Sequence, residues 1–402
     1  MTAIVFWCSL PRPGPLVVYL MKIAVPRQVQ AEETRVPLVP AVVKKLTGLG
    51  AAVLVESGAG TASHHSDGAY HQAGATILTG DGSAWAQGDV VVTIAPPALD
   101  QVSQMKEGSV LVGMLAPLDH PKIIDELARR GVTSLSMEFL PRISRAQPMD
   151  VLSSQANVAG YMAVVLAAAA CPKMFPMMIT AAGTIAPARV FVIGAGVAGL
   201  QAIATAKRLG AIVEAYDVRP VVKEQVQSVG GRFVELPVAN DQAQTAAGYA
   251  KEQSDQQRDQ QVQMMARHVI GADVVITTAA VFGKAPPLLI PQATVDQMRP
   301  GSIIVDLAAD PGLGRGNCES TRPGGRRTTK NGVVLEGTTQ LARLAPVHSS
   351  QLFANNVVAF LREILPGDGR LVVNTEDPIQ EALLVTHRGH VVHPVVLKGR
   401  QA

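Results

Sequence analysis

Short apolar runs alternate with amphipathic segments over the first part of the chain. The runs are rich in Val, Ile and Leu and indicate buried strands, whereas the segments between them have helical spacing and often end at glycine. The expected strands are Lys22–Val25, Ala52–Glu56, Thr76–Leu78, Val90–Ile94, Val110–Gly113 and Thr133–Ser136, and the expected helices are Pro40–Leu49, Ser66–Gly74 and Pro121–Arg130. This alternation predicts a parallel sheet covered by helices on both faces.

The second half repeats the alternation after a long apolar helix, which we expect over Val151–Cys171. A polar, glutamine-rich stretch, Pro237–Gln263, interrupts the pattern; its first half is expected to be a long loop and Glu252–His268 a helix. The expected strands are Val190–Ile193, Ile212–Tyr216, Arg232–Glu235, Val274–Thr277, Ile303–Asp306 and Val333–Glu336, with a late helix at Leu352–Leu365. The C-terminal segments, Asn374–Leu384 and Val391–Leu397, are expected to fold back onto the first domain.

These elements predict an α/β protein of two Rossmann-like, doubly wound parallel-sheet domains with a cleft between them. A length of 402 residues agrees with two domains. We expect residues 21–141 with 347–402 to form the first domain, and residues 142–346 to form the second, with a mobile loop at about 237–255. Residues 1–20, interrupted by three prolines, are expected to be a disordered extension or the product of a misassigned start codon.

The second domain carries a dinucleotide-binding fingerprint within Arg189–Asp217. A strand is followed by Gly194, Gly196 and Gly199 in the spacing G-x-G-x-x-G, then by a helix and a second strand. The first glycine permits a tight turn, the second lets the backbone approach a pyrophosphate, and the third packs the helix on the strand. The helix N-terminus attracts phosphates. Asp217 ends the second strand, where a carboxylate accepts ribose hydroxyls and repels a 2′-phosphate, so NAD(H) is favoured over NADP(H).

Composition narrows the class of protein further. A net charge of +3 with 4% aromatic residues does not match a nucleic-acid-binding surface. The three cysteines, Cys8, Cys171 and Cys318, are scattered, which argues against a disulfide framework and favours a reducing compartment. The best candidate for a membrane span, Val158–Cys171, is too short and is expected to be a buried core helix. The histidines show no metal-ligand spacing, so we expect no metal.

The segment Glu138–Asn157 is more specific than the fingerprint. It closely resembles the Arg-Gln-Asp loop of the NAD(H)-binding component, domain I, of proton-translocating NAD(P) transhydrogenase, a family related to alanine dehydrogenase. The resemblance covers nearly all of Met21–Leu397, including Gly248–Glu252 and Val391–Pro394. It implies that the chain binds NAD(H) and passes hydride directly to NADP⁺ bound on a partner subunit, while a membrane-spanning subunit couples the transfer to proton translocation. It also implies a cytoplasmic homodimer, held peripherally at the inner (plasma) membrane by those partners.

Carried over residue by residue, the resemblance assigns roles to this loop. The residues expected to surround the nicotinamide and its ribose are Arg142, Gln147, Asp150 and Ser153. Gln147 can both donate to and accept from the nicotinamide carboxamide, while Arg142 and Asp150 can pair and fix the loop. Hydride transfer between two nicotinamides needs no general acid or base, so these residues are expected to position the rings. The expected cofactor-binding residues are Arg142, Ile143, Ser144, Gln147, Ser153, Gly194, Gly196, Val197, Gly199, Asp217, Val218, Arg219, Gly248, Tyr249, Gln261 and Ala280.

Two other functions remain open. One is an alanine dehydrogenase-like, NAD-dependent amino-acid dehydrogenase, which needs a proton acceptor and cations for the substrate carboxylate. That family places a Lys just after the strand written here Val91–Pro96 and a His within Gly113–Leu118, and this chain has neither. The other is an NAD-binding or regulatory module without catalysis. The sequence departs from the transhydrogenase pattern at Val281–Phe282, at Gly337–Leu341 and at Asp310–Lys330, which is longer and more basic than usual.

Overall fold

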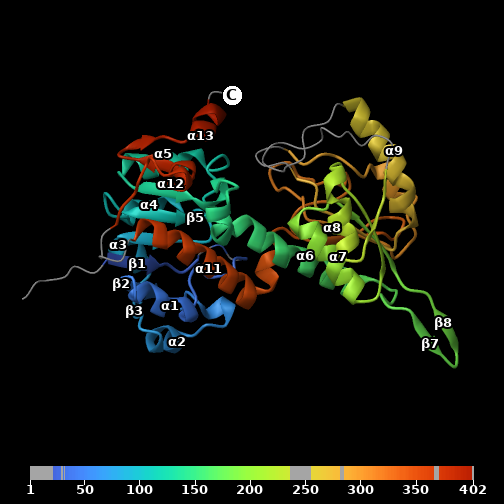
Figure 1. The fold of residues 1–402 in the computed structure, drawn as a ribbon, viewed down its shortest axis with the longest axis horizontal. Helices are drawn as coiled ribbons and strands as arrows, with labels where there is room; N and C mark the ends of the chain where they lie inside the picture. Colours follow the sequence, from blue (N-terminus) through green and yellow to red (C-terminus); the bar gives the residue numbers. More distant parts are fainter. Residues whose placement is uncertain are drawn as a thin grey trace, which may run out of the picture.

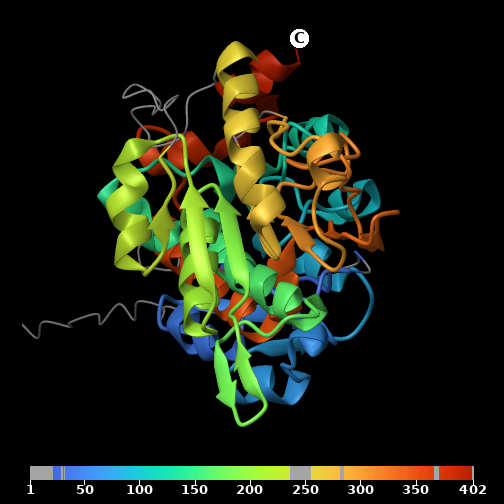
Figure 2. The ribbon, with the colours of Figure 1, turned by 90° about the vertical axis from the view of Figure 1, so that its right-hand side faces the viewer.

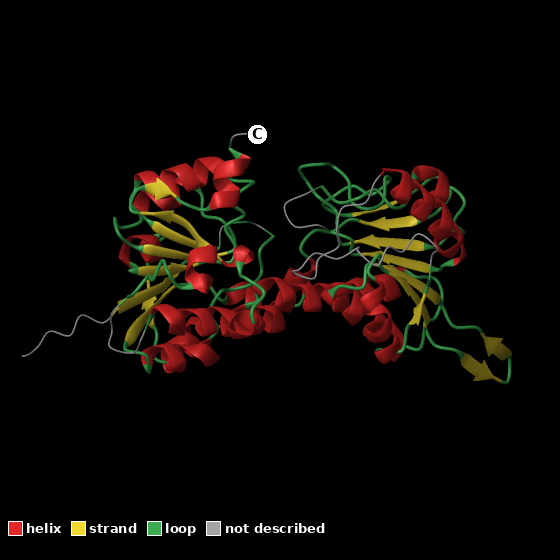
Figure 3. Cartoon of the chain, turned by 45° about the horizontal axis from the view of Figure 1, so that its top comes forward, coloured by secondary structure: helices red, strands yellow, loops and turns green. Residues whose placement is uncertain are grey.

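The computed structural model describes residues 21–28, 30, 32–235, 255–280, 285–365 and 371–400. These residues form two α/β lobes, joined by the long helices α6 (Val151–Ala170) and α11 (Pro346–Ile364) (Figure 1). Figure 3 shows one sheet in each lobe, with the two helices running between them. The expected extension at residues 1–20 and nearly all of the expected loop at 237–255 lie outside the described residues.

The first lobe is built on an eight-stranded sheet in the order β17-β16-β6-β5-β4-β1-β2-β3. Six strands are parallel, whereas the C-terminal strands β16 and β17 are antiparallel to their neighbours, which the strand pattern did not indicate. The strands are β1 (Met21–Val25), β2 (Ala51–Glu56), β3 (Thr76–Leu78), β4 (Val90–Val92), β5 (Val110–Gly113), β6 (Thr133–Ser136), β16 (Leu384–His387) and β17 (His390–Val391).

Helices cover both faces of this sheet and bury an apolar core on each face. They are α1 (Pro40–Thr47), α2 (Asp67–Gln72), α3 (Ser83–Gln87), α4 (Leu99–Gln104), α5 (Pro121–Arg129), α12 (Pro378–Leu383) and α13 (Pro394–Gly399), with short 3₁₀ turns η1 (Thr61–Ser63), η2 (Met137–Phe139) and η3 (Ser144–Met149). Helices α1 and α5 start at Pro40 and Pro121, which suits the first helical position because proline lacks an N–H there.

The second lobe contains a seven-stranded sheet in the order β11-β10-β9-β12-β13-β15-β14. Its strands are β9 (Arg189–Ile193), β10 (Ile212–Tyr216), β11 (Arg232–Phe233), β12 (Val274–Thr277), β13 (Ile303–Asp306), β14 (Arg326–Thr328) and β15 (Val334–Glu336). Its helical segments are α7 (Val197–Arg208), η4 (Pro220–Val222), α8 (Lys223–Ser228), α9 (Asp255–Gly271), α10 (Gln292–Val295) and η5 (Leu341–Leu344). The chain winds outward from β9 in one direction and from β12 in the other, and ligands of such sheets bind at this switch point.

A two-stranded hairpin, β7 (Met178–Thr180) with β8 (Gly183–Ile185), projects from the second lobe away from both sheets (Figures 1 and 2). Every residue of the two strands is exposed, including Ile179 at 74% and Ile185 at 45%. The sequence pattern did not predict this hairpin, because its apolar residues serve no core.

Helix α6 differs from the expectation that no segment could cross a bilayer. It is 20 residues long with a mean hydropathy of 1.4, so by length and composition it qualifies as a span. The expectation stopped the apolar run at Val158, but the helix continues through polar residues whose partners lie in other elements. Gln155 accepts from Arg35 and donates to the Ser349 carbonyl. An added Cβ at Gly160 would lie 2.1 Å from the Ala198 carbonyl oxygen, so α6 packs closely against α7 as an interior helix.

Candidate functional site

The turn between β9 and α7 has the geometry that the fingerprint requires. Gly194 has φ +95°, a region that favours glycine. A Cβ at Gly199 would lie 1.9 Å from the Gly194 carbonyl oxygen, so only glycine allows this helix to start so close to the strand. A Cβ at Gly196 would meet no atom within 4 Å, and Gly196 is the N-cap of α7 without a side-chain cap. The turn therefore leaves open space in front of a helix N-terminus, which suits a pyrophosphate.

Asp217 follows β10 directly and is 7% exposed. Its Oδ2 accepts from the Ala195 backbone N–H at 2.8 Å and from Arg219 Nη2 at 2.9 Å, while its Oδ1 accepts from the Arg219 backbone N–H and Nε, both at 2.9 Å. A carboxylate has about four acceptor positions, so these bonds fill it. The hydrogen bond to Asp217 raises the pKa of the Arg219 guanidinium, which stays charged. A ribose can use this carboxylate only if Arg219 withdraws.

Two residues that sequence reasoning missed support the fingerprint turn. Thr278, directly after β12, donates from Oγ1 to the Gly194 carbonyl oxygen at 3.0 Å. Asn317 is fully buried; its Oδ1 accepts from the Ala279 N–H at 3.1 Å and its Nδ2 donates to the Ala279 carbonyl at 2.8 Å. Both side chains fix the strand end beside the predicted site residue Ala280. The available signal was positional: Thr278 and Asn317 follow the strands β12 and β13, whose carboxyl ends border the switch point.

The other predicted cofactor-binding residues of the second lobe lie at the same edge of the sheet or on α9. Val197 opens α7 and is 40% exposed, Val218 follows Asp217, and Ala280 is exposed. Gln261, on α9, is 2% exposed, and its Oε1 has no hydrogen-bond partner within the described residues. A buried amide oxygen without a partner is unfavourable, so this atom fits a ligand donor. The predicted residues Gly248 and Tyr249 lie outside the described residues.

The Arg-Gln-Asp loop leads from the first lobe into α6. Arg142, Ser144 and Gln147 are exposed, and Ile143 is 40% exposed, so these predicted site residues are accessible to a ligand. Asp150 is the N-cap of α6: its carboxylate accepts from the Ser153 N–H at 2.9 Å and from Ser153 Oγ at 2.6 Å. The cap fixes Asp150 and Ser153 to each other and sets where the loop ends.

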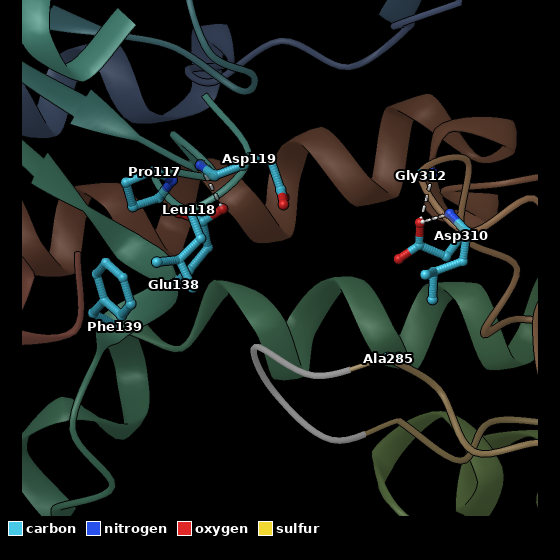
Figure 4. Close-up of a pocket in the computed structure, with 10 residues that line it drawn as sticks. Pro117, Leu118, Asp119, Glu138, Phe139, Ala285, Asp310 and Gly312 are labelled. Carbon is cyan, nitrogen blue, oxygen red and sulfur yellow. Dashed lines mark hydrogen bonds between the residues drawn. The ribbon is translucent and has the colours of Figure 1, made fainter. Parts of the chain in front are cut away.

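A cavity of about 420 Å³ lies between the lobes. Figure 4 shows Asp119, Glu138 and Phe139 on the side of the first lobe and Asp310 and Gly312 on the side of the second. Among the described residues, the ten that line this cavity include none of the predicted site residues.

Glu138 holds the strained turn at the rim of this cavity. Its carboxylate accepts from the backbone N–H groups of Leu115 at 2.9 Å and Ala116 at 3.0 Å, and Ala116 has φ +42°. Burial raises the pKa of Glu138 above its usual value, although the hydrogen bonds from Ser136 and the backbone oppose this shift. Within the described residues, no group of three or more His, Cys, Asp or Glu side chains is placed to hold a metal ion.

The fold and the site together define a two-domain dinucleotide-binding α/β protein, with the fingerprint at the switch point of one sheet. The chain belongs to the alanine dehydrogenase/PNT family. The model of the family's C-terminal domain, "Alanine dehydrogenase/PNT, C-terminal domain", matches residues 163–394, and that of its N-terminal domain matches residues 24–159.

Similar proteins agree with the transhydrogenase branch of this family. The chain is 45% identical over 383 residues to the first of the separately encoded portions of the NAD(P) transhydrogenase alpha subunit of Rhodospirillum rubrum, and the match covers 94% of this chain and 99% of that protein. It is 41% identical to the NAD(P) transhydrogenase subunit alpha of Haemophilus influenzae over 94% of this chain and 73% of that protein. The crystal structure of transhydrogenase from Sinorhizobium meliloti superposes with a TM-score of 0.80 at 38% identity, covering 93% of this chain and 99% of that one.

These matches confirm the predicted family, the two-domain α/β fold and NAD(H) as the class of cofactor. The alternative family member is more distant, because the alanine dehydrogenase of Bacillus subtilis is 27% identical over 382 residues.

Proposed function

We propose that this chain is the NAD(H)-binding subunit of a proton-translocating NAD(P)⁺ transhydrogenase of the Re/Si-specific type. It transfers hydride directly from NADH to NADP⁺ on a partner subunit, and the transfer is coupled to proton translocation. The observation that carries the proposal is the pairing of two devices. The fingerprint belongs to the second lobe, whereas Ala146 and Met149 of the Arg-Gln-Asp loop are buried in the core of the first lobe.

The residues present suit this task. Bound NADH supplies the hydride. The N-terminus of α7 and the open space at Gly196 would hold its pyrophosphate, and Asp217 would hold its adenosine ribose. Gln147, exposed on η3, would hold the nicotinamide carboxamide by donating and accepting one hydrogen bond each. No proton moves at the reacting carbon, so the chain needs no general acid or base there and acts by orienting the ring.

The cavity between the lobes argues against the amino-acid dehydrogenase alternative. A substrate carboxylate needs a cation, but the described residues that line this cavity include the acids Asp119, Glu138 and Asp310 and no Lys, Arg or His. Arg35, the nearby buried cation of the first lobe, is paired with Glu33 at 2.6 Å and also donates to Gln155. Reduction of NAD⁺ with L-alanine by the purified chain would restore that alternative.

The chain also offers support for assembly with other chains. We propose a homodimer in the cytoplasm, attached at the inner (plasma) membrane through a membrane-spanning proton-channel subunit and an NADP(H)-binding subunit. The exposed β7–β8 hairpin suits a contact between two copies, because Ile179, Ile185 and Met177 (58% exposed) are apolar side chains with no core to join.

Replacing Ile179 with Asp should convert the homodimer into a monomer, because a charge would then be buried without a partner in the apolar contact. Light scattering at micromolar concentration measures the mass. Thr184→Asp adds the same charge to an exposed position of the same hairpin and serves as the control. A wild-type chain that is already monomeric contradicts the homodimer, and a dimeric I179D variant excludes the hairpin from the contact.

The decisive experiment on function concerns Gln147. The Gln147→Asn variant shortens the side chain by about 1.5 Å. Misplacing a positioning group by about 1 Å can cost on the order of 100-fold in rate, so we expect a large fall in the single-turnover rate of hydride transfer. The NADH dissociation constant should change little, because the adenosine half is held by the fingerprint and Asp217. Stopped-flow measurement with an NADP(H)-binding partner subunit isolates the hydride step. Transfer at the wild-type rate would remove the main support for the proposed function, whereas NADH binding without any transfer by the wild-type chain would favour the idle module.

A further inference from the structure

The Arg-Gln-Asp loop takes its position from the C-terminal region of the chain. Ala146 and Met149 are 1% and 3% exposed and belong to the same apolar core as Phe353 and Val357 of α11. Gln147 lies between these two buried residues and is exposed. The loop is therefore seated on α11 by its apolar residues, and this seating directs Gln147 outward. Apolar packing alone allows small shifts, so the polar contacts decide how closely the loop is fixed.

Asn356 of α11 makes such a contact with the residue that follows Gln147. Its Nδ2 donates to the Pro148 carbonyl oxygen at 2.7 Å. The Asn356 side chain is buried, with the residue 9% exposed, and its Oδ1 has no hydrogen-bond partner within the described residues. Burial of an amide with only one bond is less favourable than burial of an apolar side chain of similar size. The residue is thus poorly suited to stabilising α11, and its one bond is directed at the loop.

Arg145 ties the other side of the same turn. Its guanidinium pairs with Glu363 at the end of α11, at 3.3 Å, and with Asp377. Asp377 is itself fixed, because it caps α12 by accepting from the N–H groups of Ile379 at 3.0 Å and Gln380 at 3.2 Å. The Arg145 side chain is 46% exposed, so these ion pairs are screened by water and hold the loop more weakly than the Asn356 bond.

We propose that Asn356 is a positioning residue for hydride transfer, acting through Pro148 on Gln147, and that Arg145 is a second, weaker anchor of the same loop. The proposal rests on the function proposed above. Neither side chain has to contact NADH. Loss of the Asn356 bond frees the Pro148 carbonyl, and the loop then carries Gln147 away from its working position. The rate of hydride transfer falls, while the affinity for NADH, which depends mainly on the second lobe, is kept.

The test is the Asn356→Leu variant, which keeps the volume and removes the donor. Its matched control is Asn355→Leu, the same change at the exposed neighbouring position of α11. We expect the single-turnover rate of N356L to fall by about 10-fold or more, with the NADH dissociation constant within about 2-fold of wild type and N355L unchanged in both. A folded N356L variant with the wild-type rate overturns the proposal, and so does an equal loss of rate in N355L.

If N356L does not fold, Arg145→Gln provides the test, because this side chain is half exposed and can be changed without opening the core. Arg362→Gln is its control, an exposed arginine on α11. We expect R145Q to slow hydride transfer by a few-fold without weakening NADH and R362Q to have no effect. A rate for R145Q equal to that of R362Q overturns the assignment of Arg145.

Hydrogen exchange separates failure of this inference from failure of the proposed function. The N–H groups of Ala146 and Asp150 donate within the turn, to Ile143 and Gln147. In N356L, their exchange should be faster than in N355L, whereas the amides of α7 should exchange at the same rate in both. If the wild-type chain transfers no hydride, the proposed function fails, yet this difference still shows that Asn356 fixes the loop. Equal exchange in the two variants overturns the anchoring itself.

Discussion

The two lobes place a buried carboxylate at the same point of equivalent strand pairs. In the first lobe, Val25 pairs with Val55, and the next residue, Glu56, accepts from the backbone N–H of Arg27 at 3.0 Å. In the second lobe, Ile193 pairs with Tyr216, and the next residue, Asp217, accepts from the backbone N–H of Ala195 at 2.8 Å. In both lobes the acid binds the amide two residues beyond the first strand of the pair.

The lobes differ in the chain segment after that amide. After β9, three glycines turn the chain and α7 begins at Val197, so a helix N-terminus lies beside the carboxylate. After β1, the chain continues with Pro26 and has no glycine before α1 begins at Pro40, while the second oxygen of Glu56 accepts from Gly82. The acid at the strand end is therefore part of the shared architecture. The short glycine turn is what converts one copy into a nucleotide site.

The largest effect should come from Gly199→Ala, which makes the second lobe resemble the first. The added Cβ would lie 1.9 Å from the Gly194 carbonyl oxygen, so the turn must open and the N-terminus of α7 must move away. Overpacking of this kind costs about 1–3 kcal/mol of stability. We expect a folded protein whose NADH affinity by titration calorimetry is lowered by more than ~100-fold, because the phosphate site is lost. Gly271→Ala, where a Cβ meets no atom within 4 Å, is the control. Near-normal NADH binding by G199A would show that the turn is not the phosphate site.

A smaller effect is expected from Asp217→Ala. Loss of a charged hydrogen-bonding group costs roughly 1.5–3 kcal/mol, or about 10- to 100-fold in NADH affinity. Discrimination against NADPH should weaken as well, because the repulsion of a 2′-phosphate disappears. Titration calorimetry with both nucleotides measures the two effects. Glu56→Gln changes the equivalent acid of the first lobe and should leave both affinities unchanged. If E56Q weakens NADH as much as D217A does, the division of roles between the lobes is wrong.

The smallest effect concerns Glu138, a buried acid of the first lobe with a raised pKa. Because its folded-state pKa lies above its unfolded value of 4.5, the folded state binds the proton more tightly. Stability conferred by the protonated form is therefore lost as the pH rises from about 4.5 through the raised pKa. We expect Glu138→Gln to show a flatter fall in the free energy of unfolding over this window than wild type. Denaturant titrations from pH 4 to 7 provide the comparison; parallel pH profiles contradict the assignment.

The sequence predicted most of the sheet strands because apolar runs such as Val190–Ile193 and Val274–Thr277 are buried on both faces, and burial of this kind leaves a clear pattern. Boundaries failed where other forces act. The last long helix begins at Pro346 and not at Leu352, because proline suits the first helical position. The β7–β8 hairpin was missed because its exposed apolar residues pack on nothing within the described chain.

The candidate site was predictable where its residues are local in sequence. Gly194, Gly199 and Asp217 lie within one strand-turn-helix-strand unit, so spacing alone revealed them. Asn356 and Pro148 are 208 residues apart, and a hydrogen bond over that separation leaves no periodic signal. The same holds for Asn317, which reaches Ala279 across 38 residues. Residues that position a loop from a distant helix therefore emerge only from the fold.

The pair formed by Asp217 and Arg219 makes nucleotide binding an exchange of partners. A guanidinium already satisfies the carboxylate, and a ribose must displace it, so the measured dissociation constant equals the intrinsic one divided by the fraction of molecules in which Arg219 has withdrawn. Each ~1.4 kcal/mol that favours the closed pair weakens the apparent affinity tenfold. The side chain two residues from the ribose acid thus adjusts how firmly the protein retains its nucleotide, without any change in the contacts that select it.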